Sequence, residues 1–151
     1  MTLRLVTFLG LAGALATMAS TPPVATPIPG KIDFNRDVRP ILSDTCFKCH
    51  GPDASARKAK LSLHIPESAF AHRDGKPAIV PGHPDQSEAW LRLISTDPEE
   101  QMPPPKSGIK LTPQQVKILG RWIEQGAEYQ PHWAFIPPKA PAIPKVSNPN
   151  W

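Results

Sequence analysis

The distribution of proline most limits how this chain can fold. The sequence contains 21 prolines, and ten of them lie in two short stretches, residues 21–30 and 131–150. Proline lacks a backbone N–H and its ring fixes φ, so neither stretch can supply a helix interior or a central strand. We therefore expect a Pro-rich linker at 21–30, one folded domain at 31–130, and a Pro-rich tail or connector at 131–151.

The first twenty residues have the pattern of an export signal. Arg4 precedes an apolar run from Leu5 to Ala16, and small residues follow it. This run is shorter than the roughly 20 apolar residues that a membrane-spanning helix needs. Residues 1–20 are therefore predicted to be a secretory signal peptide, with an uncleaved N-terminal anchor as the alternative. The protein is expected to be periplasmic or otherwise exported, and to associate with a membrane only through this segment.

The charge pattern disfavours nucleic acid as a partner. The formal net charge is +4, with lysines and arginines scattered among acidic residues. No basic run is interleaved with aromatic residues that could stack on bases, so we predict no nucleic-acid binding. A mildly basic face suits contact with an acidic partner protein.

Three segments of the predicted domain show helical patterns. The first contains apolar residues at helical spacing that lead into Cys46, with Asp37 as the expected N-cap and Pro40 in the first turn: Phe34, Val38, Ile41 and Leu42. The second covers about residues 86–95 and begins with a capping-box-like pair, Asp85 and Glu88. The third is bounded by start and stop signals: Thr112, Pro113, Gln115 and Gly126.

Between these helices the sequence predicts loops. Residues 51–60 are polar, and residues 97–110 have no periodicity but contain three consecutive prolines. Leu61 and Leu63 alternate with polar residues and predict a short extended piece, while residues 66–72 predict a helical turn or two.

The chemistry of the chain is concentrated in Cys46-Phe47-Lys48-Cys49-His50. Haem attachment needs two thiols that reach two vinyl groups on one edge of the macrocycle, and a histidine that reaches the iron from the same backbone. This pattern supplies all three in five residues. We predict one haem c per chain, with Cys46 and Cys49 as thioethers and His50 as the proximal iron ligand.

Three other interpretations of the cysteines stay open. A thioredoxin-like redox pair would open a helix after a buried strand, whereas these cysteines follow a predicted helix. A structural zinc site would have to recruit distant histidines, because the chain has two cysteines in all. A surface disulfide between Cys46 and Cys49 would leave His50 unexplained.

The second axial ligand is predicted to be Met102. It is the only methionine outside residues 1–20, and it lies in the proline-rich loop before the last helix. A thioether opposite His50 would raise the reduction potential and suit electron transfer; the alternative is that Met102 fills space in the core. The rival ligands inside the predicted domain are three histidines, of which His83 is the strongest because it leads into the second helix: His64, His72 and His83.

The sequence resembles the planctomycete-type cytochrome c domain, a relative of the class I cytochromes c. The segments that carry the resemblance span nearly all of the predicted domain: IDFNRDVRPIL (32–42), CFKCHGPD (46–53), AIVPGHP (78–84), QMPP (101–104), LTPQQ (111–115) and WIEQGA (122–127).

The resemblance implies an all-α, small cytochrome c-like fold, with three main helices around a covalently bound haem and long irregular loops. It also implies attachment through Cys46 and Cys49, His50 and Met102 as axial ligands, and a crossing of the terminal helices near Gly120. Residues 132–138 resemble the segment that connects this domain to a following domain in relatives. The chain is therefore expected to be the N-terminal part of a longer multidomain protein.

One region departs from the resemblance. Relatives often have a glycine-rich approach and an acidic residue near Leu63, whereas this chain has Lys58, Ala59 and Lys60, followed by His64. The expected function is electron transfer to a redox partner protein or to an attached downstream domain. The alternative is a haem module of a larger enzyme, peroxidase-like or serving an attached catalytic domain. That alternative needs an open iron position and a distal acid/base pair, which no residue pair here clearly supplies.

Overall fold

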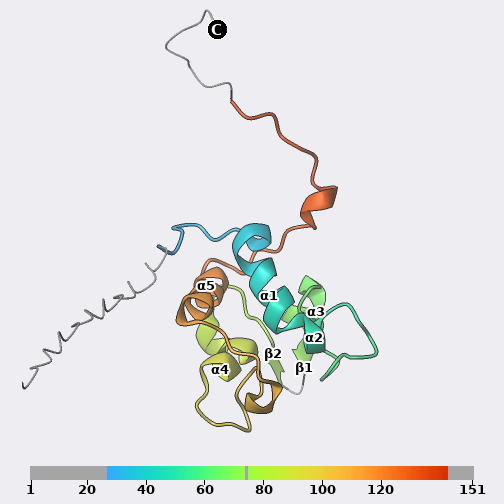
Figure 1. Ribbon diagram of the computed structural model, residues 1–151, viewed down its shortest axis with the longest axis vertical. Helices are drawn as coiled ribbons and strands as arrows, with labels where there is room; N and C mark the ends of the chain where they lie inside the picture. The colour runs from blue at the N-terminus through green and yellow to red at the C-terminus, as the bar shows by residue number, and fades with distance from the viewer. Residues whose placement is uncertain (1–26, 74, 143–151) are drawn as a thin grey trace, which may run out of the picture.

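Helical segments separated by long loops make up most of the described chain. The structure is a computed structural model that describes residues 27–73 and 75–142 (Figure 1). The predicted signal peptide, residues 1–20, lies outside the described residues. The elements follow one another in this order: η1 (Phe34–Val38), α1 (Arg39–Thr45), α2 (Phe47–His50), α3 (Pro66–Phe70), β1 (His72–Arg73), β2 (Lys76–Pro77), η2 (Pro84–Gln86), α4 (Glu88–Ile94), η3 (Pro105–Ser107), α5 (Pro113–Glu124) and η4 (Trp133–Phe135).

The first helical segment begins earlier than predicted. Asp33, not Asp37, is the N-cap, and its carboxylate accepts a hydrogen bond from the Arg36 N–H at 2.9 Å. The Asp37 carboxylate accepts one in return from the Asp33 N–H at 2.8 Å, so the two acids close the first turn together. This turn is a π-helix, η1, and α1 continues from it with Pro40 in its first turn, as predicted. The predicted apolar residues of this segment are all buried: Phe34, Val38, Ile41 and Leu42.

Helix α5 is capped as its sequence predicts. The Thr112 hydroxyl accepts a hydrogen bond from the Gln115 N–H, and the Gln115 side chain accepts one from the Thr112 N–H, which completes the capping box. Gly126, with φ of 100°, follows the end of the helix. Its conformation lets the chain turn back over the core, because only glycine adopts this φ without steric cost.

The capping box predicted for α4 is wrong. The N-cap is Ser87, whose side chain does not cap the helix. The buried Ser87 hydroxyl instead accepts a hydrogen bond from the Val80 N–H and donates one to the His83 carbonyl, both at 2.8 Å. Ser87 therefore holds the preceding turn to the start of α4, a tertiary contact that no local spacing could indicate.

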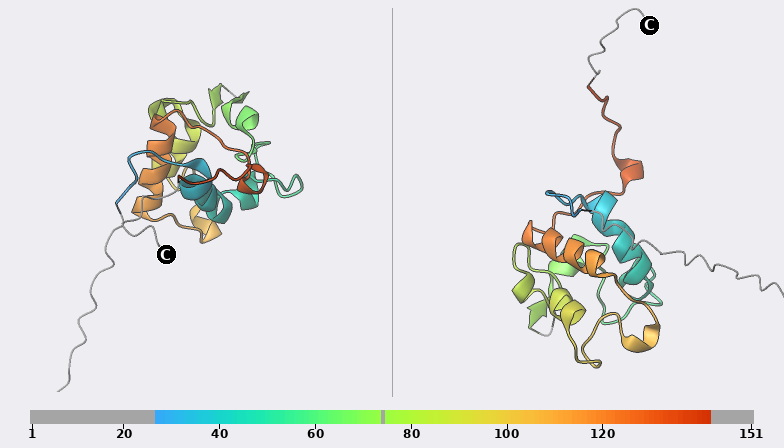
Figure 2. Two further views of the ribbon diagram at one scale, coloured as in Figure 1. Left: turned by 90° about the horizontal axis from the view of Figure 1, so that it is seen from above. Right: turned by 60° about the vertical axis from the view of Figure 1, so that its left-hand side comes forward.

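The expected role of Gly120 is also corrected. A Cβ atom at Gly120 would lie 2.6 Å from the Trp90 indole, so the glycine makes room for a side chain of α4 rather than for the first helix. Helix α5 packs against both η1 and α4 (Figures 1 and 2). The crossing near Gly120 was implied by the resemblance, and the atoms nearest to a Cβ at Gly120 all belong to Trp90 of α4.

Two loop predictions have different outcomes. Residues 51–60 form the predicted polar loop, beyond α2 in Figure 1. Leu61 and Leu63 form no strand. The described strands are β1 and β2, of two residues each, which pair His72 with Pro77 and Arg73 with Lys76. The described chain is otherwise helix-rich, which is compatible with a small cytochrome-like fold. Strands this short show no alternation that a sequence pattern could detect.

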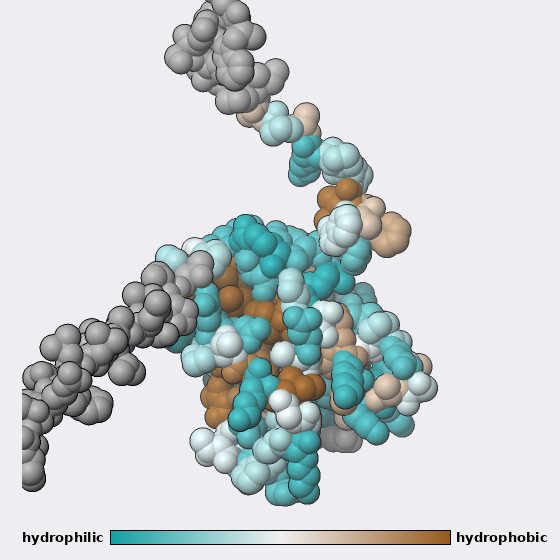
Figure 3. All heavy atoms as spheres, viewed as in Figure 1, coloured by the Kyte–Doolittle hydropathy of each residue, from teal (hydrophilic) through white to brown (hydrophobic). Residues whose placement is uncertain are grey.

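A single cluster of buried apolar side chains joins the elements. It contains residues from η1, α1, α3, the loops and α5: Ile32, Phe34, Val38, Ile41, Leu42, Leu63, Ala69, Ala78, Ile79, Leu119, Trp122, Ile123 and Ala127. In Figure 3, polar side chains surround an apolar patch on this face of the body. No helix in the described ranges is long and apolar enough to cross a membrane.

Candidate haem site

Cys46 lies at the junction between α1 and α2. Its N–H donates to the Leu42 carbonyl at the end of α1, and its carbonyl accepts from the His50 N–H at the end of α2, both at 2.8 Å. Its thiol is partly buried and lies 3.3 Å from the Thr45 hydroxyl, which itself donates to the Ile41 carbonyl. Burial raises the pKa of the Cys46 thiol, so the free thiol form dominates at neutral pH.

Cys49 follows within the same helical turn. It is a partly exposed free thiol, and its N–H donates to the Cys46 carbonyl at 3.1 Å. Residues three apart on a helical turn lie on one face, so the local helix sets both thiols side by side. This arrangement suits attachment to one edge of a flat ligand.

His50 ends α2 with a partly buried imidazole. Its Nδ1 is buried and has no hydrogen-bond partner among the described residues. Burial lowers the pKa of His50, while the backbone carbonyls of Lys58 and Leu61 oppose that shift. The imidazole is therefore neutral at pH 7 and can serve as a metal ligand. A buried polar nitrogen without a partner is uncommon in folded proteins and is consistent with a ligand site.

The backbone around the motif is closely constrained. The Lys58 N–H donates to the Cys49 carbonyl, and the Leu63 N–H donates to the His50 carbonyl, both at 2.8 Å. A Cβ atom at Gly51 would lie 2.2 Å from the Phe47 carbonyl oxygen, so only glycine fits directly after the histidine. The chain must turn sharply here, and the following loop is thereby held against α2.

Met102 is partly buried in the loop that follows α4. Its N–H donates to the Arg92 carbonyl at 2.9 Å, which ties the loop to the end of that helix. None of the hydrogen bonds or ring contacts of the described residues joins Met102 to the Cys46–His50 motif. Its role as the second axial ligand therefore stays a prediction.

Among the rival histidines, His64 rather than His83 lies beside the motif. The His64 ring is 6.0 Å from the Phe47 ring in an edge-on arrangement, and its Nδ1 is also buried without a partner in the described chain. Burial lowers the pKa of His64, and the positive charges of Arg57 and Arg39 lower it further. His72 and His83 are exposed.

Three observations bear on the other interpretations of the cysteines. Helix α1, not a buried strand, precedes Cys46. Within residues 27–73 and 75–142, no group of three or more histidine, cysteine or acidic side chains is placed to hold a metal ion. Both cysteines are free thiols. Two thiols three residues apart and a directly following imidazole form a donor set that fits haem c.

Two cavities lie elsewhere in the described body. One, of about 350 Å³, is bounded by residues 28–30, Trp90 and α5. The other, of about 570 Å³, is bounded by the β1–β2 hairpin, Phe70 and Leu91. Neither is lined by the Cys46–His50 motif or by Met102, so the fit to haem rests on the donor set and on its backbone geometry.

Sequence reasoning missed two residues that shape this site, Gly51 and Tyr129. Gly51 could have been found from its place directly after the motif, where a sharp turn follows a helix. Tyr129 is the only tyrosine in the chain and comes three residues after the glycine that ends α5. Its hydroxyl donates to the Leu63 carbonyl at 3.0 Å, a contact across 66 residues that no local pattern predicts.

Comparison with known families identifies the same segment. Residues 46–106 match the family model described as Planctomycete cytochrome C. The search of curated proteins found no match, and neither did the search of solved structures. The matched residues begin at Cys46 and include His50 and Met102. A cytochrome c family implies haem as the cofactor, in keeping with the spacing of Cys46 and Cys49. Residues 46–106 of this chain therefore belong to a planctomycete-type cytochrome c domain.

Proposed function

We propose that residues 31–130 form an exported electron-transfer domain that binds one haem c. In this proposal Cys46 and Cys49 form the two thioether links, and His50 is the proximal iron ligand. The bound haem supplies a reversible one-electron change between ferrous and ferric iron. The chain supplies the attachment, the ligands and the partial burial that tune the reduction potential.

The observation that carries this proposal is the neutral, partly buried imidazole of His50, one residue after the second of two free thiols. Its Nδ1 has no partner in the described chain, and both flanking backbone carbonyls, of Cys49 and His50, accept hydrogen bonds from the following loop. Hydrogen bonds to the backbone of a metal-binding residue help to orient its side chain for the metal.

Met102 is the proposed second ligand. It lies in a proline-rich loop whose backbone is hydrogen-bonded to α4, so the thioether is carried on a restrained segment. A sulfur ligand opposite histidine raises the potential relative to two histidines. His64, beside Phe47, is the residue most suited to replace it if Met102 is removed.

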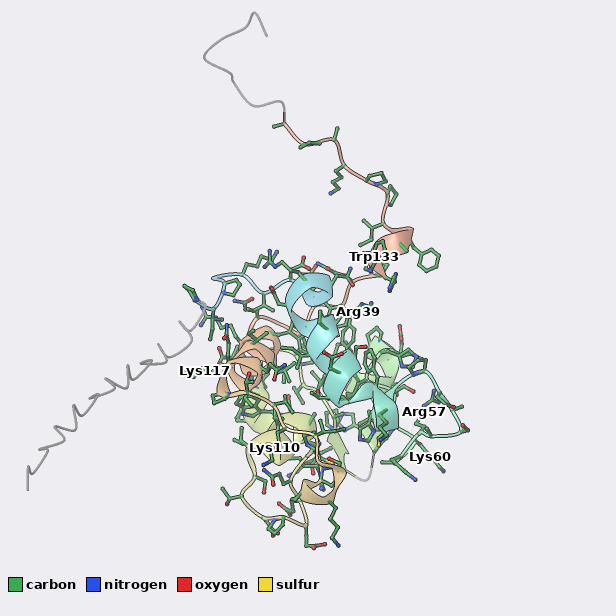
Figure 4. All side chains as sticks on the ribbon, in the orientation of Figure 1. Arg39, Arg57, Lys60, Lys110, Lys117 and Trp133 are labelled. Carbon is green, nitrogen blue, oxygen red and sulfur yellow. The ribbon has the colours of Figure 1, made fainter. Side chains whose placement is uncertain are left out.

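The proposed redox partner presents an acidic surface. Three lysines in or near the motif are exposed: Lys48, Lys58 and Lys60. Lys60 lies in the loop that follows α2 (Figure 4). Arg57, which is partly buried, donates instead to the backbone carbonyls of Gly51 and Pro52. A cationic rim steers an acidic partner, or an acidic face of an attached domain, toward the motif.

An optical and mass analysis tests the proposal. The full chain is expressed in a host that attaches haem c, beside Cys46→Ala/Cys49→Ala and Met102→Ala variants. We expect the parent chain to gain the mass of one haem and to give a low-spin spectrum when reduced. The double cysteine variant should gain no covalent haem, while Met102→Ala should keep the haem but change its spin state or ligand. A parent chain at bare polypeptide mass would refute the proposal.

A further inference from the structure

Tyr129 is connected to the proposed proximal ligand by two hydrogen bonds. Its Oη donates to the Leu63 carbonyl at 3.0 Å, and the Leu63 N–H donates to the His50 carbonyl at 2.8 Å. Leu63 is buried and belongs to the core. The segment that follows α5 therefore closes over the loop that leaves the Cys46–His50 motif.

The ring of Tyr129 is held by other aromatic rings. Its centroid lies 4.6 Å from that of Phe34, 5.1 Å from that of Trp122 and 5.7 Å from that of Phe70. Burial raises the pKa of Tyr129 above its ordinary value, so the phenol keeps its proton and stays a donor at physiological pH. The position of the hydroxyl is thus set by packing rather than by the hydrogen bond alone.

The backbone is anchored on both sides of Tyr129. The Trp122 Nε1–H donates to the Glu128 carbonyl at 3.1 Å. On the other side, the Asn35 N–H donates to the Gln130 side-chain oxygen at 3.2 Å, and Arg39 donates to the Gln130 carbonyl at 3.0 Å. The position of Tyr129 is therefore set by contacts other than the one to Leu63, so its hydroxyl can restrain the position of Leu63.

We propose that Tyr129 is a positioning residue for His50, holding the loop at Leu63 so that the backbone of the proximal ligand keeps one orientation. This inference rests on the proposed function for the role of His50. Without the Tyr129 hydroxyl, the Leu63 carbonyl loses its donor and the loop opens more often. More frequent opening admits water beside the iron site, and water favours the more highly charged ferric form.

The test compares Tyr129→Phe with Phe70→Leu in the haem-loaded full chain. Tyr129→Phe keeps the ring and removes only the donor, while Phe70→Leu weakens the ring cluster and leaves the donor in place. We expect Tyr129→Phe to lower the reduction potential and to speed amide exchange at Leu63 about tenfold, the effect of one lost buried hydrogen bond. Phe70→Leu should lower thermal stability but change the potential and the exchange rate less than Tyr129→Phe does, because Phe34 and Trp122 still hold the Tyr129 ring.

Two results would overturn the inference: parental potential and parental Leu63 exchange in Tyr129→Phe, or equal shifts in both variants. A parent chain without haem would refute the proposed function separately. In that case, amide exchange at Leu63 in the haem-free chain still tests whether Tyr129 holds the loop. An unchanged exchange rate in Tyr129→Phe would show that it does not.

Discussion

Gly51 determines whether the chain can turn directly after the proposed proximal ligand. A Cβ atom there would meet the Phe47 carbonyl oxygen at 2.2 Å and the Phe47 Cβ at 2.7 Å. These are atoms of a helical turn, and they cannot move aside without distorting α2. The need for glycine at position 51 therefore comes from the backbone of the Cys46–His50 motif itself.

Gly51→Ala is therefore expected to destabilise the fold by about 1–3 kcal/mol, the usual cost of overpacking. Chemical denaturation of the variant and the parent measures this difference. Gly30→Ala is the matched control, because a Cβ at Gly30 would have no atom within 4 Å. Equal stability of the two variants would contradict the steric account.

The backbone conformation of Lys60 is itself unfavourable for a residue with a side chain. Ala59 and Lys60 have φ angles of 50° and 52°, in the left-handed region that disfavours residues with a Cβ. The turn is therefore made by two residues that favour this conformation less than glycine would.

We expect Lys60→Gly to stabilise the folded state by about 0.5–1 kcal/mol, because relief of the left-handed strain exceeds the added entropy of the unfolded chain. Urea denaturation provides the measurement. Lys58→Gly serves as the control, since its φ is not positive and glycine should there be neutral or destabilising. A loss of stability in Lys60→Gly would show that the left-handed strain is not the larger effect.

At the scale of elements, the contact between α4 and α5 depends on one glycine and one indole. The Trp90 ring occupies the space above Gly120, within 2.6–3.3 Å of where a Cβ would be. Alanine favours a helix over glycine by about 1 kcal/mol, so propensity and packing act in opposite directions at this site.

Gly120→Ala should destabilise the parent chain, because the clash with a packed ring exceeds the gain in helix propensity. In a Trp90→Leu background the same substitution should instead stabilise by about 1 kcal/mol. A double-mutant cycle monitored by thermal unfolding measures the reversal. Additive effects of the two substitutions would show that the ring and the glycine do not interact.

At the scale of the whole molecule, the described chain divides near Gln130. The Gln130 side chain is hydrogen-bonded to Asn35 and Asp33, and the Gln130 carbonyl accepts from Arg39. The Pro131 carbonyl also accepts from the Asn35 side chain, so the first helical segment holds the chain as far as this residue. Beyond it the tail exposes apolar side chains, with Trp133 67% and Phe135 83% exposed (Figures 3 and 4). These side chains bury little surface, so they can add little to the stability of the body.

Deletion of residues 132–151 should change the free energy of unfolding by less than about 0.5 kcal/mol. Deletion of residues 130–151 should cost about 1–3 kcal/mol, because donors on Asn35 and Arg39 lose their partners. Denaturant titrations of both truncations test this boundary. Equal losses in the two would place the end of the domain within the tail.

The sequence by itself determined the parts of this protein that depend on neighbours along the chain. The C-x-x-C-H spacing, the Thr112 capping box, the apolar face from Phe34 to Leu42 and the polar loop at 51–60 follow from residues a few positions apart, and the resemblance pointed to the same family as the match at 46–106. Local hydrogen bonds and helical periodicity act over one or two turns, which is the range that a pattern can report.

Only the tertiary structure decided which distant residues meet. It paired Gly120 with Trp90, gave the Ser87 hydroxyl to the preceding turn, and brought Tyr129 to Leu63. It also placed His64, not His83, beside the motif. These contacts depend on how helices and loops fill one shared core, and that packing depends on shape and burial across the whole chain rather than on the spacing of residues along it.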